Sequence, residues 1–586
     1  MGVDIASLEN HGCDKSLAEI FARLGFSGLM KRFDFGEDGA AAQTAESVPE
    51  VRCADKDTLF ALSGDIAVSL EDGYIYAANN DAIYKTEAEA LRGESFPYPV
   101  ICHDRKKLYR AMCEHSIQAE CSFDTMSAAY LLSPGESAYP FDKTALRYLS
   151  VQIPDGAEGA SAWAALRLKA PLADEIEKEG MTDLLKNIEI PLSPVLARME
   201  KAGFRLDCDG LHKYIESLCE MQTQLAERIY MQAGRTFNIN SPKQLGEVLF
   251  DDLGLPAGKK TKTGYSTGAE ILEKLRPYHP IVEDILDWRQ VTKLIGTYGE
   301  NLIALADGDG CVHTTFNQTG TATGRLSSLD PNMQNIPVRG QLGRELRRYF
   351  TARDKDHVLI DADYSQIELR LLADIAGDEV MIQSYLDGDD IHAATAAKVF
   401  GVPLESVTKE LRTKAKAVNF GIVYGIGDFS LSQDLHVSRK AAREYIDSYL
   451  STFTGVDKYL KNTVAAAREN GYTTTRFGRR RPIPELASSN KNLQAFGERV
   501  AMNSPIQGTA ADIIKIAMIN TDRALREENI DARLILQVHD ELIVEAARGC
   551  ADKAAEILKR EMESAADTRV PLSAEVNMGD NWYDAK

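Results

Sequence analysis

Strand-like and helix-like patterns of apolar positions occupy different parts of the chain. Residues 51–150 mix short β-like runs, such as TLFALSGDIAVSL and GYIYAA, with helical runs such as FDTMSAAYLL, which is typical of an α/β unit. Residues 175–235 are mostly helical, helical signals dominate from 378 to 500, and residues 530–545 and 571–577 are strand-like. We find no internal repeat, so the order predicts an α/β unit followed by a larger part that mixes helices with strands.

Three stretches predict their elements clearly. HVLIDADY (357–364) predicts a strand, and SQIELRLLAD (365–374) predicts a helix directly after it. In FNINSPKQLGEVLF, Ser241 is the expected N-cap of a helix and Pro242 its first residue. LILQVHDELIVE (534–545) predicts two apolar strands joined at a pair of acidic residues.

Length and composition limit the class of protein. At about 150 residues per domain, a chain of 586 residues predicts roughly three to five domains. No stretch approaches the roughly 20 apolar residues that span a bilayer, and the start, MGVDIASLENHG, lacks the basic head of a signal peptide. The nine cysteines are scattered without any CxxC, which argues against structural zinc. We expect a cytoplasmic protein from a reducing compartment, without a membrane partner.

The net charge of −21 taken alone argues against a polyanionic partner, but its distribution is uneven. Residues 1–190 hold 18 Lys and Arg against 32 Asp and Glu, a net of −14. Residues 191–586 hold 49 against 56, a net of −7. A local basic groove in the second part therefore remains possible.

Acidic residues stand where the predicted strands end. Asp363 lies at the end of one strand, and Asp540 and Glu541 lie at the joint of two others. An exposed acidic turn would explain the second group without function. If the strands are neighbours, however, Asp363 and Asp540 converge, and such carboxylates attract Mg²⁺. Two ions about 3.5–4 Å apart can activate an attacking oxygen and stabilise a leaving one.

Glu368 has two explanations at this stage. Ser365 and Glu368 fit the S-x-x-E capping box, which would place Glu368 at the start of a helix for structural reasons alone. For an isolated match the structural and the functional explanation are about equal.

A stripe of four side chains is the next candidate. In LRTKAKAVNFGIVYG, Arg412, Lys416, Phe420 and Tyr424 are spaced four apart, so they lie along one side of a helix. Singly, the cations would form a solvated face and the aromatics would belong to the core. As a unit they suit a nucleotide, because cations bind phosphates and an aromatic ring packs on a base.

Two further segments carry side chains suited to a DNA duplex. TATGRLSSLDPNMQNIP (321–337) and ERVAMNSPIQGTAADIIK (498–515) contain Arg, Asn and Gln, which can reach minor-groove acceptors without recognising sequence. Singly, each would more often be a cap or a surface polar group. The residues are Arg325, Asn332, Gln334, Arg499, Asn503 and Gln507.

The motifs together resemble those of the family A DNA polymerases over nearly the whole chain, most strongly from residue 191 to 586. DYSQIELR resembles motif A, RTKAKAVNFGIVYG resembles motif B on the fingers helix, and VHDE resembles motif C. TATGRLSS, PNMQNIP, DIHAATA, GRRRP and NSPIQGTAADIIK also follow in the family's order.

The resemblance implies an α+β multidomain fold, a right hand with a palm of antiparallel sheet and helical fingers and thumb. An α/β ribonuclease-H-like domain of the 3′–5′ exonuclease type would precede it. The implied boundaries are 1–35 for a segment that follows a missing 5′-nuclease domain, 36–190 for the exonuclease-like domain, 191–306 for the thumb, 307–377 and 501–586 for the palm, and 378–500 for the fingers. The chain would then be an engineered large fragment or a natural short form.

The resemblance also implies a role for each site residue. Asp363 and Asp540, with Tyr364 as a further ligand and Glu541 beside them, would hold two Mg²⁺ ions, for which Mn²⁺ can substitute. Arg412, Lys416 and His392 would hold the incoming triphosphate, Phe420 and Tyr424 would pack on the new base pair, and Gln366 would also contact the dNTP. Glu368 would exclude the sugar 2′-OH. Primer-template DNA would contact Arg325, Asn332, Gln334, Arg499, Asn503, Gln507 and His539, and KKTKTGYST (259–267) would meet its backbone. We expect a monomer.

The N-terminal third departs from the proofreading form of the family. Ser63 and Asp65 fall where the family has D-x-E, Leu108 falls where it has Asp, and Arg167 stands near the last Asp position. We therefore expect an exonuclease-like domain without exonuclease activity.

Two other classes of function remain as alternatives to a polymerase. A non-catalytic DNA-binding scaffold derived from one would be expected to have lost Asp363, Asp540 or Lys416, and all three are present. A two-metal nuclease could use the same carboxylates, but it would not need the stripe from Arg412 to Tyr424.

Overall fold

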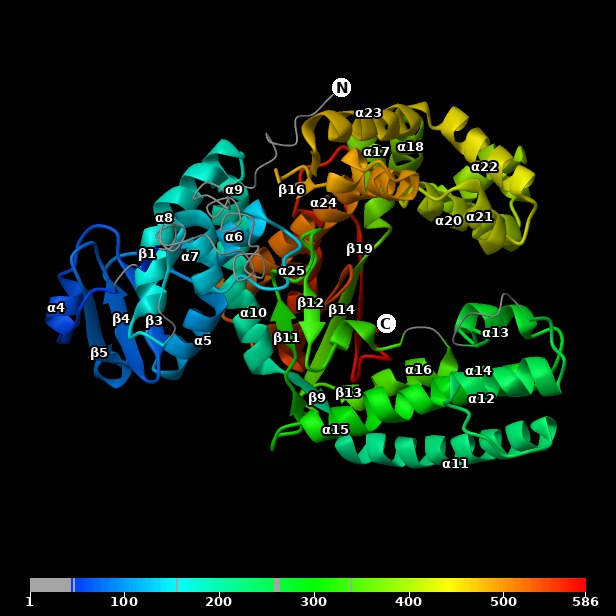
Figure 1. Cartoon of the computed structure of the whole chain (residues 1–586), viewed down its shortest axis with the longest axis horizontal. Helices are drawn as coiled ribbons and strands as arrows, with labels where there is room; N and C mark the ends of the chain where they lie inside the picture. The colour runs from blue at the N-terminus through cyan, green and yellow to red at the C-terminus, as the bar shows by residue number, and fades with distance from the viewer. Residues whose placement is uncertain (1–43, 46–47, 154–155, 258–263, 338–339) are drawn as a thin grey trace, which may run out of the picture.

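The computed structural model describes residues 44–45, 48–153, 156–257, 264–337 and 340–586. The predicted segment 1–35 lies outside the described residues, as does most of KKTKTGYST. Figure 1 shows an N-terminal unit at the left, a central sheet, and two helical lobes at the right, one above and one below.

The N-terminal unit is built on a six-stranded mixed sheet in the order β2-β5-β4-β3-β6-β7. Strands β3, β6 and β7 run parallel, whereas β3, β4 and β5 form an antiparallel meander. This confirms the α/β pattern of residues 51–150. The elements are β1 (Thr44–Ala45), β2 (Val51–Cys53), α4 (Lys56–Phe60), β3 (Ala67–Glu71), β4 (Tyr74–Ala78), β5 (Ile83–Glu87), η2 (Ala88–Leu91), β6 (Val100–Cys102), α5 (Arg105–Glu114), β7 (Cys121–Asp124), α6 (Thr125–Leu132), α7 (Phe141–Leu149), β8 (Val151–Gln152) and α8 (Ala160–Lys178).

One β-like run of the sequence is only partly a strand. In TLFALSGDIAVSL the first residues belong to helix α4, because Asp55 caps that helix by accepting a hydrogen bond from the Thr58 amide at 2.9 Å. The strand β3 begins only at Ala67. The alternation of apolar residues did not reveal this change of element.

The lower lobe corresponds to the predicted thumb, and it is helical as expected. Its long helix α11 packs against α14. Ser241 caps α12 and Pro242 is its first residue, as the sequence predicted. The elements of the lobe are α11 (Cys208–Ala233), α12 (Pro242–Gly246), η4 (Glu247–Asp252), α13 (Ala269–Leu275), α14 (Ile281–Lys293), η5 (Leu294–Glu300) and α15 (Asn301–Leu305). Before them in the chain, α9 (Thr182–Leu184), η3 (Leu185–Glu189) and α10 (Ile190–Ala202) pack against helices of the N-terminal unit, and β9 (Phe204–Leu206) pairs with β10 (Cys311–Val312) and β13 (Phe350–Thr351).

The central sheet is antiparallel and has the strand order β17-β18-β14-β19. The strand predicted from HVLIDADY is β14, with the expected bounds. Its register places Asp363 opposite Glu541 on β18 and opposite Glu575 on β19. The elements are β10 (Cys311–Val312), β11 (Thr315–Asn317), β12 (Ser327–Leu329), η6 (Met333–Asn335), α16 (Gln341–Glu345), η7 (Leu346–Tyr349), β13 (Phe350–Thr351), β14 (His357–Tyr364), β17 (Ala532–Val538), β18 (Glu541–Ala547), η10 (Arg548–Cys550), α25 (Ala551–Glu563) and β19 (Ala574–Gly579).

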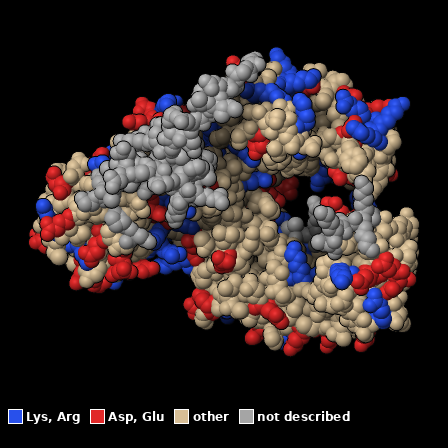
Figure 2. Space-filling view, in the orientation of Figure 1, with Lys and Arg blue, Asp and Glu red and all other residues tan. Residues whose placement is uncertain are grey.

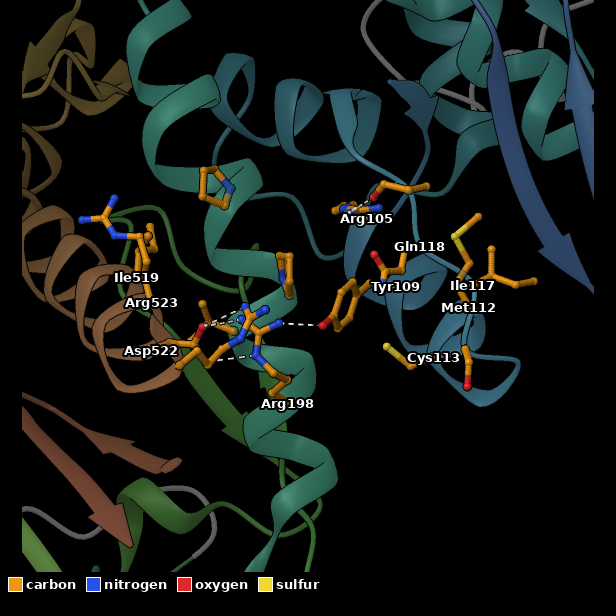
Figure 3. A pocket seen from close by; sticks show the side chains of 16 residues that line it. Arg105, Tyr109, Met112, Cys113, Ile117, Gln118, Arg198, Ile519, Asp522 and Arg523 are labelled. Carbon is orange, nitrogen blue, oxygen red and sulfur yellow. Dashed lines mark hydrogen bonds and ion pairs between the residues drawn. The ribbon is translucent and has the colours of Figure 1, made fainter. Parts of the chain in front are cut away.

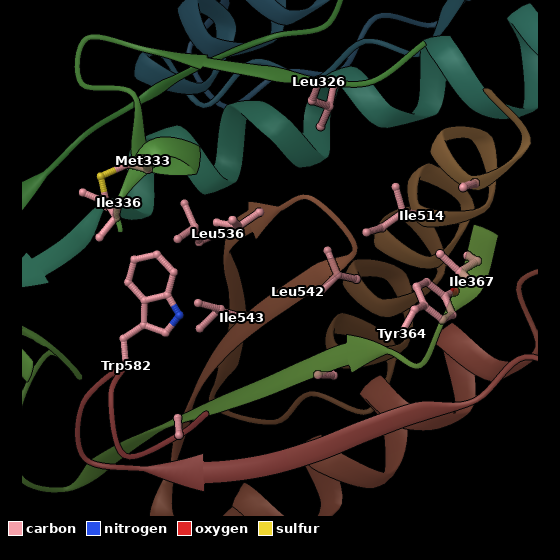
Figure 4. Close-up of a cluster of buried hydrophobic side chains, with 14 of the residues drawn as sticks. Leu326, Met333, Ile336, Tyr364, Ile367, Ile514, Leu536, Leu542, Ile543 and Trp582 are labelled. Atoms are coloured by element: carbon pink, nitrogen blue, oxygen red, sulfur yellow. The ribbon is translucent and has the colours of Figure 1, made fainter. Parts of the chain in front are cut away.

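Apolar side chains from this sheet and from helices above it form one buried cluster. In Figure 4, Leu536, Leu542 and Ile543 from the β17–β18 hairpin lie between Trp582 on one side and Ile514 on the other. Residues far apart in the sequence thus share one core, and burying them favours folding by about 25 cal/mol for each Å² of apolar surface. The two ends of β14 are fixed by this core.

The upper lobe corresponds to the predicted fingers. It is helical apart from one short hairpin, as the sequence indicated, and its last helix, α24, runs down to the central sheet (Figure 1). The elements are α17 (Ile367–Ala376), α18 (Glu379–Leu386), α19 (Ile391–Phe400), η8 (Leu404–Ser406), α20 (Lys409–Val423), α21 (Asp428–Leu435), α22 (Arg439–Thr452), α23 (Thr454–Asn470), β15 (Tyr472–Thr474), β16 (Arg480–Pro482), η9 (Pro484–Ala487) and α24 (Lys491–Glu527).

One contact between the N-terminal unit and the rest of the molecule is made by α5, which packs against α10 near α24. Arg198 on α10 binds Asp522 on α24, with 2.9 Å between Nε and Oδ1, and donates from Nη1 to the Tyr109 hydroxyl on α5 at 2.6 Å (Figure 3). These residues line a pocket of about 510 Å³ between the three helices. One guanidinium therefore connects both parts of the chain.

Candidate active site

Asp363 and Asp540 come together at one end of the central sheet. Asp363 is near the end of β14, and Asp540 lies in the turn between β17 and β18. The amide of Tyr364 donates to the carbonyl of Asp540 at 3.1 Å, which fixes the turn against the end of β14. The expectation that these strands are neighbours is confirmed, and the two carboxylates share one surface.

Both carboxyl groups hold their negative charge less readily than usual. Burial, reinforced by the nearby carboxylate of Glu368, raises the pKa of Asp540 to about 6, while Arg325 acts in the opposite direction. Burial also raises the pKa of Asp363, and the Lys586 ammonium, 3.8 Å from its carboxylate, opposes this. A cation bound between the two carboxylates would stabilise the charged form of each.

The donor set fits a hard divalent cation. Mg²⁺ in phosphoryl-transfer sites takes one or two carboxylates and completes its shell with water and substrate phosphates. Among the described residues, no group of three or more His, Cys, Asp or Glu side chains is placed to hold an ion. Within the described residues, the carboxylates that we assign to an ion are those of Asp363 and Asp540.

Tyr364 and Glu541 are adjacent to the pair in sequence, but their side chains have other partners. The Tyr364 hydroxyl donates to the carbonyl of Met562 at 2.6 Å, so only its main chain is left for the predicted metal ligation. Glu541 is buried in β18 and accepts from Trp582 Nε1 at 2.7 Å and from the Lys586 ammonium. The exposed acidic turn that the sequence allowed is therefore wrong, because Glu541 belongs to the core.

Glu368 connects the palm to the fingers and takes part in no capping box. Helix α17 begins at Ile367, and its N-cap is Gln366, which makes no side-chain cap hydrogen bond. Instead, one Glu368 oxygen accepts from Arg325 Nη2 at 2.7 Å and the other from the Tyr424 hydroxyl at 2.9 Å. The capping alternative is wrong, and this buried carboxylate lies beside Asp540.

The predicted stripe lies along α20 and slightly beyond its end. Arg412 donates from Nε to Asp390 at 2.6 Å, and Lys416 is exposed. The rings of Phe420 and Tyr424 are stacked, with their centroids 6.4 Å apart, although Tyr424 is already the C-cap. Two cations followed by two aromatic rings are thus presented on one side, as predicted.

His392 is held behind this stripe by a residue that sequence reasoning missed. His392 is buried on α19, its ring lies 5.9 Å from that of Phe420, and burial lowers its pKa to about 4, so the imidazole is neutral at pH 7. Asn419 donates from Nδ2 to His392 Nδ1 at 2.9 Å and accepts from the Thr395 hydroxyl at 3.1 Å. The available signal was a single amide on the otherwise apolar buried side of α20.

Gln366 stands at the junction of β14 and α17. It adopts a left-handed backbone with φ of 55°, which non-glycine residues rarely do. Its side-chain oxygen accepts from the Tyr385 hydroxyl at 3.4 Å. The residue thus connects the end of β14, which carries Asp363, with helix α18, which carries Tyr385.

The residues predicted to contact DNA lie in two groups. Arg499, Asn503 and Gln507 occupy successive turns of α24, and Asn503 Oδ1 is buried without a hydrogen-bond partner among the described residues. The second group surrounds the acidic hairpin: Asn332 caps η6, Gln334 donates to Gln537 at 2.9 Å, and His539 adopts a φ of 52° in the turn before Asp540. For Asn332 the cap that we named as the alternative is therefore present.

The surface between the two helical lobes is hollowed. Figure 2 shows an opening between the upper and lower lobes, with Lys and Arg side chains gathered on the upper lobe. Asp and Glu side chains gather at the far end of the N-terminal unit. The charged residues, which are unevenly distributed along the sequence, are therefore also unevenly distributed over this face of the molecule.

The positions named for the exonuclease-like site do not share one place in the sheet. Ser63 and Asp65 lie in the connection between α4 and β3, where Asp65 pairs with Lys169. Leu108 is buried on α5, and the Arg167 guanidinium lies 5.7 Å from the Trp163 ring centroid. Because β3 begins only at Ala67, the D-x-E alignment placed these residues before the strand rather than on it.

Comparisons with known proteins agree with this fold and site. Residues 208–584 match DNA polymerase family A. DNA polymerase I of Caldicellulosiruptor bescii is 44% identical, over 97% of this chain and 69% of that protein, and DNA polymerase I of Geobacillus stearothermophilus is 42% identical, over 98% of this chain and 70% of that protein. The POL domain of Pol1 from M. smegmatis, solved in complex with DNA primer-template and dNTP, has a TM-score of 0.86 and 35% identity, covering 92% of this chain and 100% of that one.

The antiparallel palm sheet with its paired carboxylates, flanked by helical lobes, defines a DNA-directed DNA polymerase. The chain belongs to DNA polymerase family A. Within the described residues, every helix is too short or too polar to cross a bilayer.

Proposed function

We propose that the chain adds dNTPs to a primer 3′-OH opposite a DNA template and releases pyrophosphate, in DNA replication and repair. The observation that carries this proposal is the hydrogen bond from the Tyr364 amide to the Asp540 carbonyl, which joins motif A to motif C and places Asp363 and Asp540 side by side. The M. smegmatis relative, solved with primer-template DNA and dNTP, supports these partners. We expect the protein to act as a cytoplasmic monomer.

The carboxylates of Asp363 and Asp540, with the main chain of Tyr364, would hold two Mg²⁺ ions. When bound, such ions neutralise phosphate charge and lower the pKa of the attacking hydroxyl. Glu541 would contribute indirectly: bonded to Trp582 and Lys586, it fixes the β18 strand that follows Asp540. The protein itself mainly positions the reactants and neutralises charge.

The stripe on α20 would hold the incoming nucleotide. Arg412 and Lys416 would bind the triphosphate, and Arg412 would exchange Asp390 for a phosphate oxygen. Phe420 and Tyr424 offer ring faces to the base pair and sugar. His392, neutral at pH 7, would act as a hydrogen-bond donor rather than as a cation, and Gln366 would contact the nucleotide from the palm side.

Glu368 would exclude ribonucleotides. Its carboxylate is buried and held from two sides by Arg325 and Tyr424, so it cannot easily move aside for a 2′-hydroxyl. A site of fixed shape discriminates by excluding the larger sugar.

Primer-template DNA would lie in the opening between the lobes. Arg325, Arg499, Asn503 and Gln507 would contact the minor groove, with Asn332, Gln334 and His539 near the primer end. Binding should weaken as salt rises, since phosphate contacts release counterions.

The N-terminal unit, residues 36–190, would be an exonuclease-like domain without activity. The cleft at the ends of β3 and β6 is lined by acids and by Lys85 and Lys107, so its negative charge is partly compensated. The remaining boundaries are proposed as the resemblance implies them: thumb 191–306, palm 307–377 and 501–586, and fingers 378–500. Helix α17 and most of α24 then belong to the palm, although both helices lie with the upper lobe.

A primer-extension assay with Mg²⁺ and each dNTP tests the function and separates it from the two alternatives. Template-directed growth of the primer is expected. A scaffold would bind DNA without extending it, and a nuclease would shorten it. Either result with intact, folded protein would contradict the proposal.

A further inference from the structure

A tyrosine of the N-terminal unit reaches into the palm. Tyr130 on α6 is fully buried, and its hydroxyl donates to the main-chain carbonyl of Thr321 at 2.8 Å. Thr321 begins the TATGR loop, residues 321–325, which ends at Arg325. The contact therefore joins the exonuclease-like unit directly to a loop of the proposed DNA-binding surface.

The TATGR loop is held tightly between the units. Gly324 has a φ of 86°, and a Cβ added there would lie 2.5 Å from Nε of Arg479, so no larger residue fits without displacing that side chain. On the other side, a Cβ at Gly508 of α24 would come within 3.2 Å of the Thr323 carbonyl. The loop has little freedom to shift unless its neighbours do.

Arg479 is itself fixed by buried charges. It donates to Asp512 from Nε at 2.9 Å and also binds Glu189, which accepts from Lys515 at 2.8 Å. Buried ions are costly to separate, so this group forms a rigid support under the loop. The Arg479 guanidinium lies 5.9 Å from the Tyr130 ring centroid, so the same support backs the tyrosine.

From the loop, hydrogen bonds continue into the active site. The Thr321 hydroxyl donates to the Arg325 carbonyl at 2.7 Å. Arg325 donates to Glu368, which accepts in turn from Tyr424 of the fingers at 2.9 Å. The path from Tyr130 to Tyr424 thus consists of consecutive contacts between described residues.

We propose that Tyr130 is a positioning residue for nucleotide addition. It holds the TATGR loop, and through it the guanidinium of Arg325, in the place where Arg325 meets the primer-template. This inference rests on the proposed function, specifically on the DNA-contacting role of Arg325. It gives the N-terminal unit a part in polymerisation that needs no exonuclease chemistry.

The chain offers a matched control in Tyr109. Its hydroxyl also joins the N-terminal unit to the rest of the chain, by accepting from Arg198 at 2.6 Å (Figure 3). This contact leads to α10 and α24 rather than to the TATGR loop. Tyr109→Phe and Tyr130→Phe each remove one interdomain hydroxyl, but only Tyr130→Phe removes one on the path to Arg325.

The experiment is a double-mutant cycle. Tyr130→Phe, Tyr109→Phe, Arg325→Ala and Tyr130→Phe/Arg325→Ala are compared in maximal extension rate, KM for dNTP, primer-template Kd and Tm. We expect Tyr130→Phe to lower the maximal rate by about fivefold, with KM for dNTP unchanged and a Tm close to that of Tyr109→Phe. In the Arg325→Ala background the same change should have no further effect, because the residue that it positions is absent.

Two results would overturn the inference. One is an equal loss of rate from Tyr130→Phe with and without Arg325, and the other is the same loss from Tyr109→Phe. The Arg325→Ala variant tests the proposed function of Arg325 separately. If it extends primers at the wild-type rate, the DNA-contacting role of Arg325 is wrong, whatever the rate of Tyr130→Phe. Thr321→Val, which removes the hydroxyl bonded to the Arg325 carbonyl, provides a second variant on the palm side and should reproduce the Tyr130→Phe rate loss.

Discussion

Asp363 on β14 and Glu541 on the neighbouring strand β18 are directly paired in the central sheet, and this register places the preceding residue, Asp540, beside Asp363. The Glu541 carboxylate is bound within the protein by Trp582 and Lys586, whereas Asp363 and Asp540 are only half-buried. Two adjacent acids of one motif are thus placed differently: Glu541 anchors the hairpin, and Asp540 faces the proposed metal site.

Asp363→Asn or Asp540→Asn should abolish primer extension, by at least about three orders of magnitude, and leave primer-template binding within about twofold. Each change removes a metal ligand but little volume. Extension in Mg²⁺ and DNA affinity in its absence are the measurements. Glu575→Gln, on the strand on the other side of Asp363, is the matched control and should extend normally. Near wild-type extension by either aspartate variant would contradict the ligand assignment.

Glu368→Ala should increase ribonucleotide incorporation by more than it lowers dNTP use. The change opens space at the sugar and also releases Arg325 and Tyr424 from their shared carboxylate. Competition between rNTP and dNTP on one template measures the ratio. As a control, Glu368→Gln keeps the side-chain volume and should keep most of the discrimination between the two sugars. Equal selectivity of the wild type and Glu368→Ala would rule out the steric gate.

The sequence predicted this site well because its motifs are local. A strand end followed by a helix, a four-residue stripe and an acidic hairpin are each visible within about 15 residues, and all three are present. The partners of Glu368 are not local: Arg325 and Tyr424 lie 43 and 56 residues away, so the capping box was the only partner that a short window could offer. Contacts such as Tyr130 with Thr321, 191 residues apart, have no signal in the pattern at all.

Phe420→Tyr should increase the use of dideoxynucleotides, because on the proposed packing of this ring against the incoming sugar the added hydroxyl can replace a hydrogen bond of the missing 3′-OH. The ring of Phe420 contacts the rings of His392 and Tyr424, with centroid distances of 5.9 Å and 6.4 Å. The ratio of dideoxy to deoxy incorporation is the measurement, with Phe400→Tyr as control, since this half-buried ring at the end of α19 packs against Tyr445. An unchanged ratio would mean that the ring does not pack on the incoming sugar.

His392 should make stability depend on pH between about 4 and 6.5. Its pKa in the folded protein is about 4, below the ordinary value of 6.5, so folding favours the neutral imidazole. The stabilisation is complete above pH 6.5, and it is lost as pH falls towards 4 because the unfolded chain takes up a proton that the folded chain refuses. The measurement is the free energy of unfolding of the wild type and of His392→Gln at pH 7.5 and 5.0. The wild type should lose more stability between the two pH values, and equal losses would show that another group titrates.

The purified chain should lack 3′→5′ exonuclease activity. Cleavage of a phosphodiester by two metals needs several carboxylates that converge on the cations. Of the positions named from the sequence, Asp65 is paired with Lys169, Leu108 is buried in the apolar core and Arg167 is a cation. The cleft at the ends of β3 and β6 does contain Glu71 and Asp104, but Lys85 and Lys107 line it with them and would weaken cation binding.

The substrate for testing this absence of exonuclease activity is a 3′-labelled single strand, incubated with Mg²⁺ and then Mn²⁺ without dNTPs. It should remain intact in the wild type. Stepwise shortening that persists in Asp540→Asn and disappears in Glu71→Gln/Asp104→Asn would show a live site in this cleft, which would make the predicted loss of activity wrong.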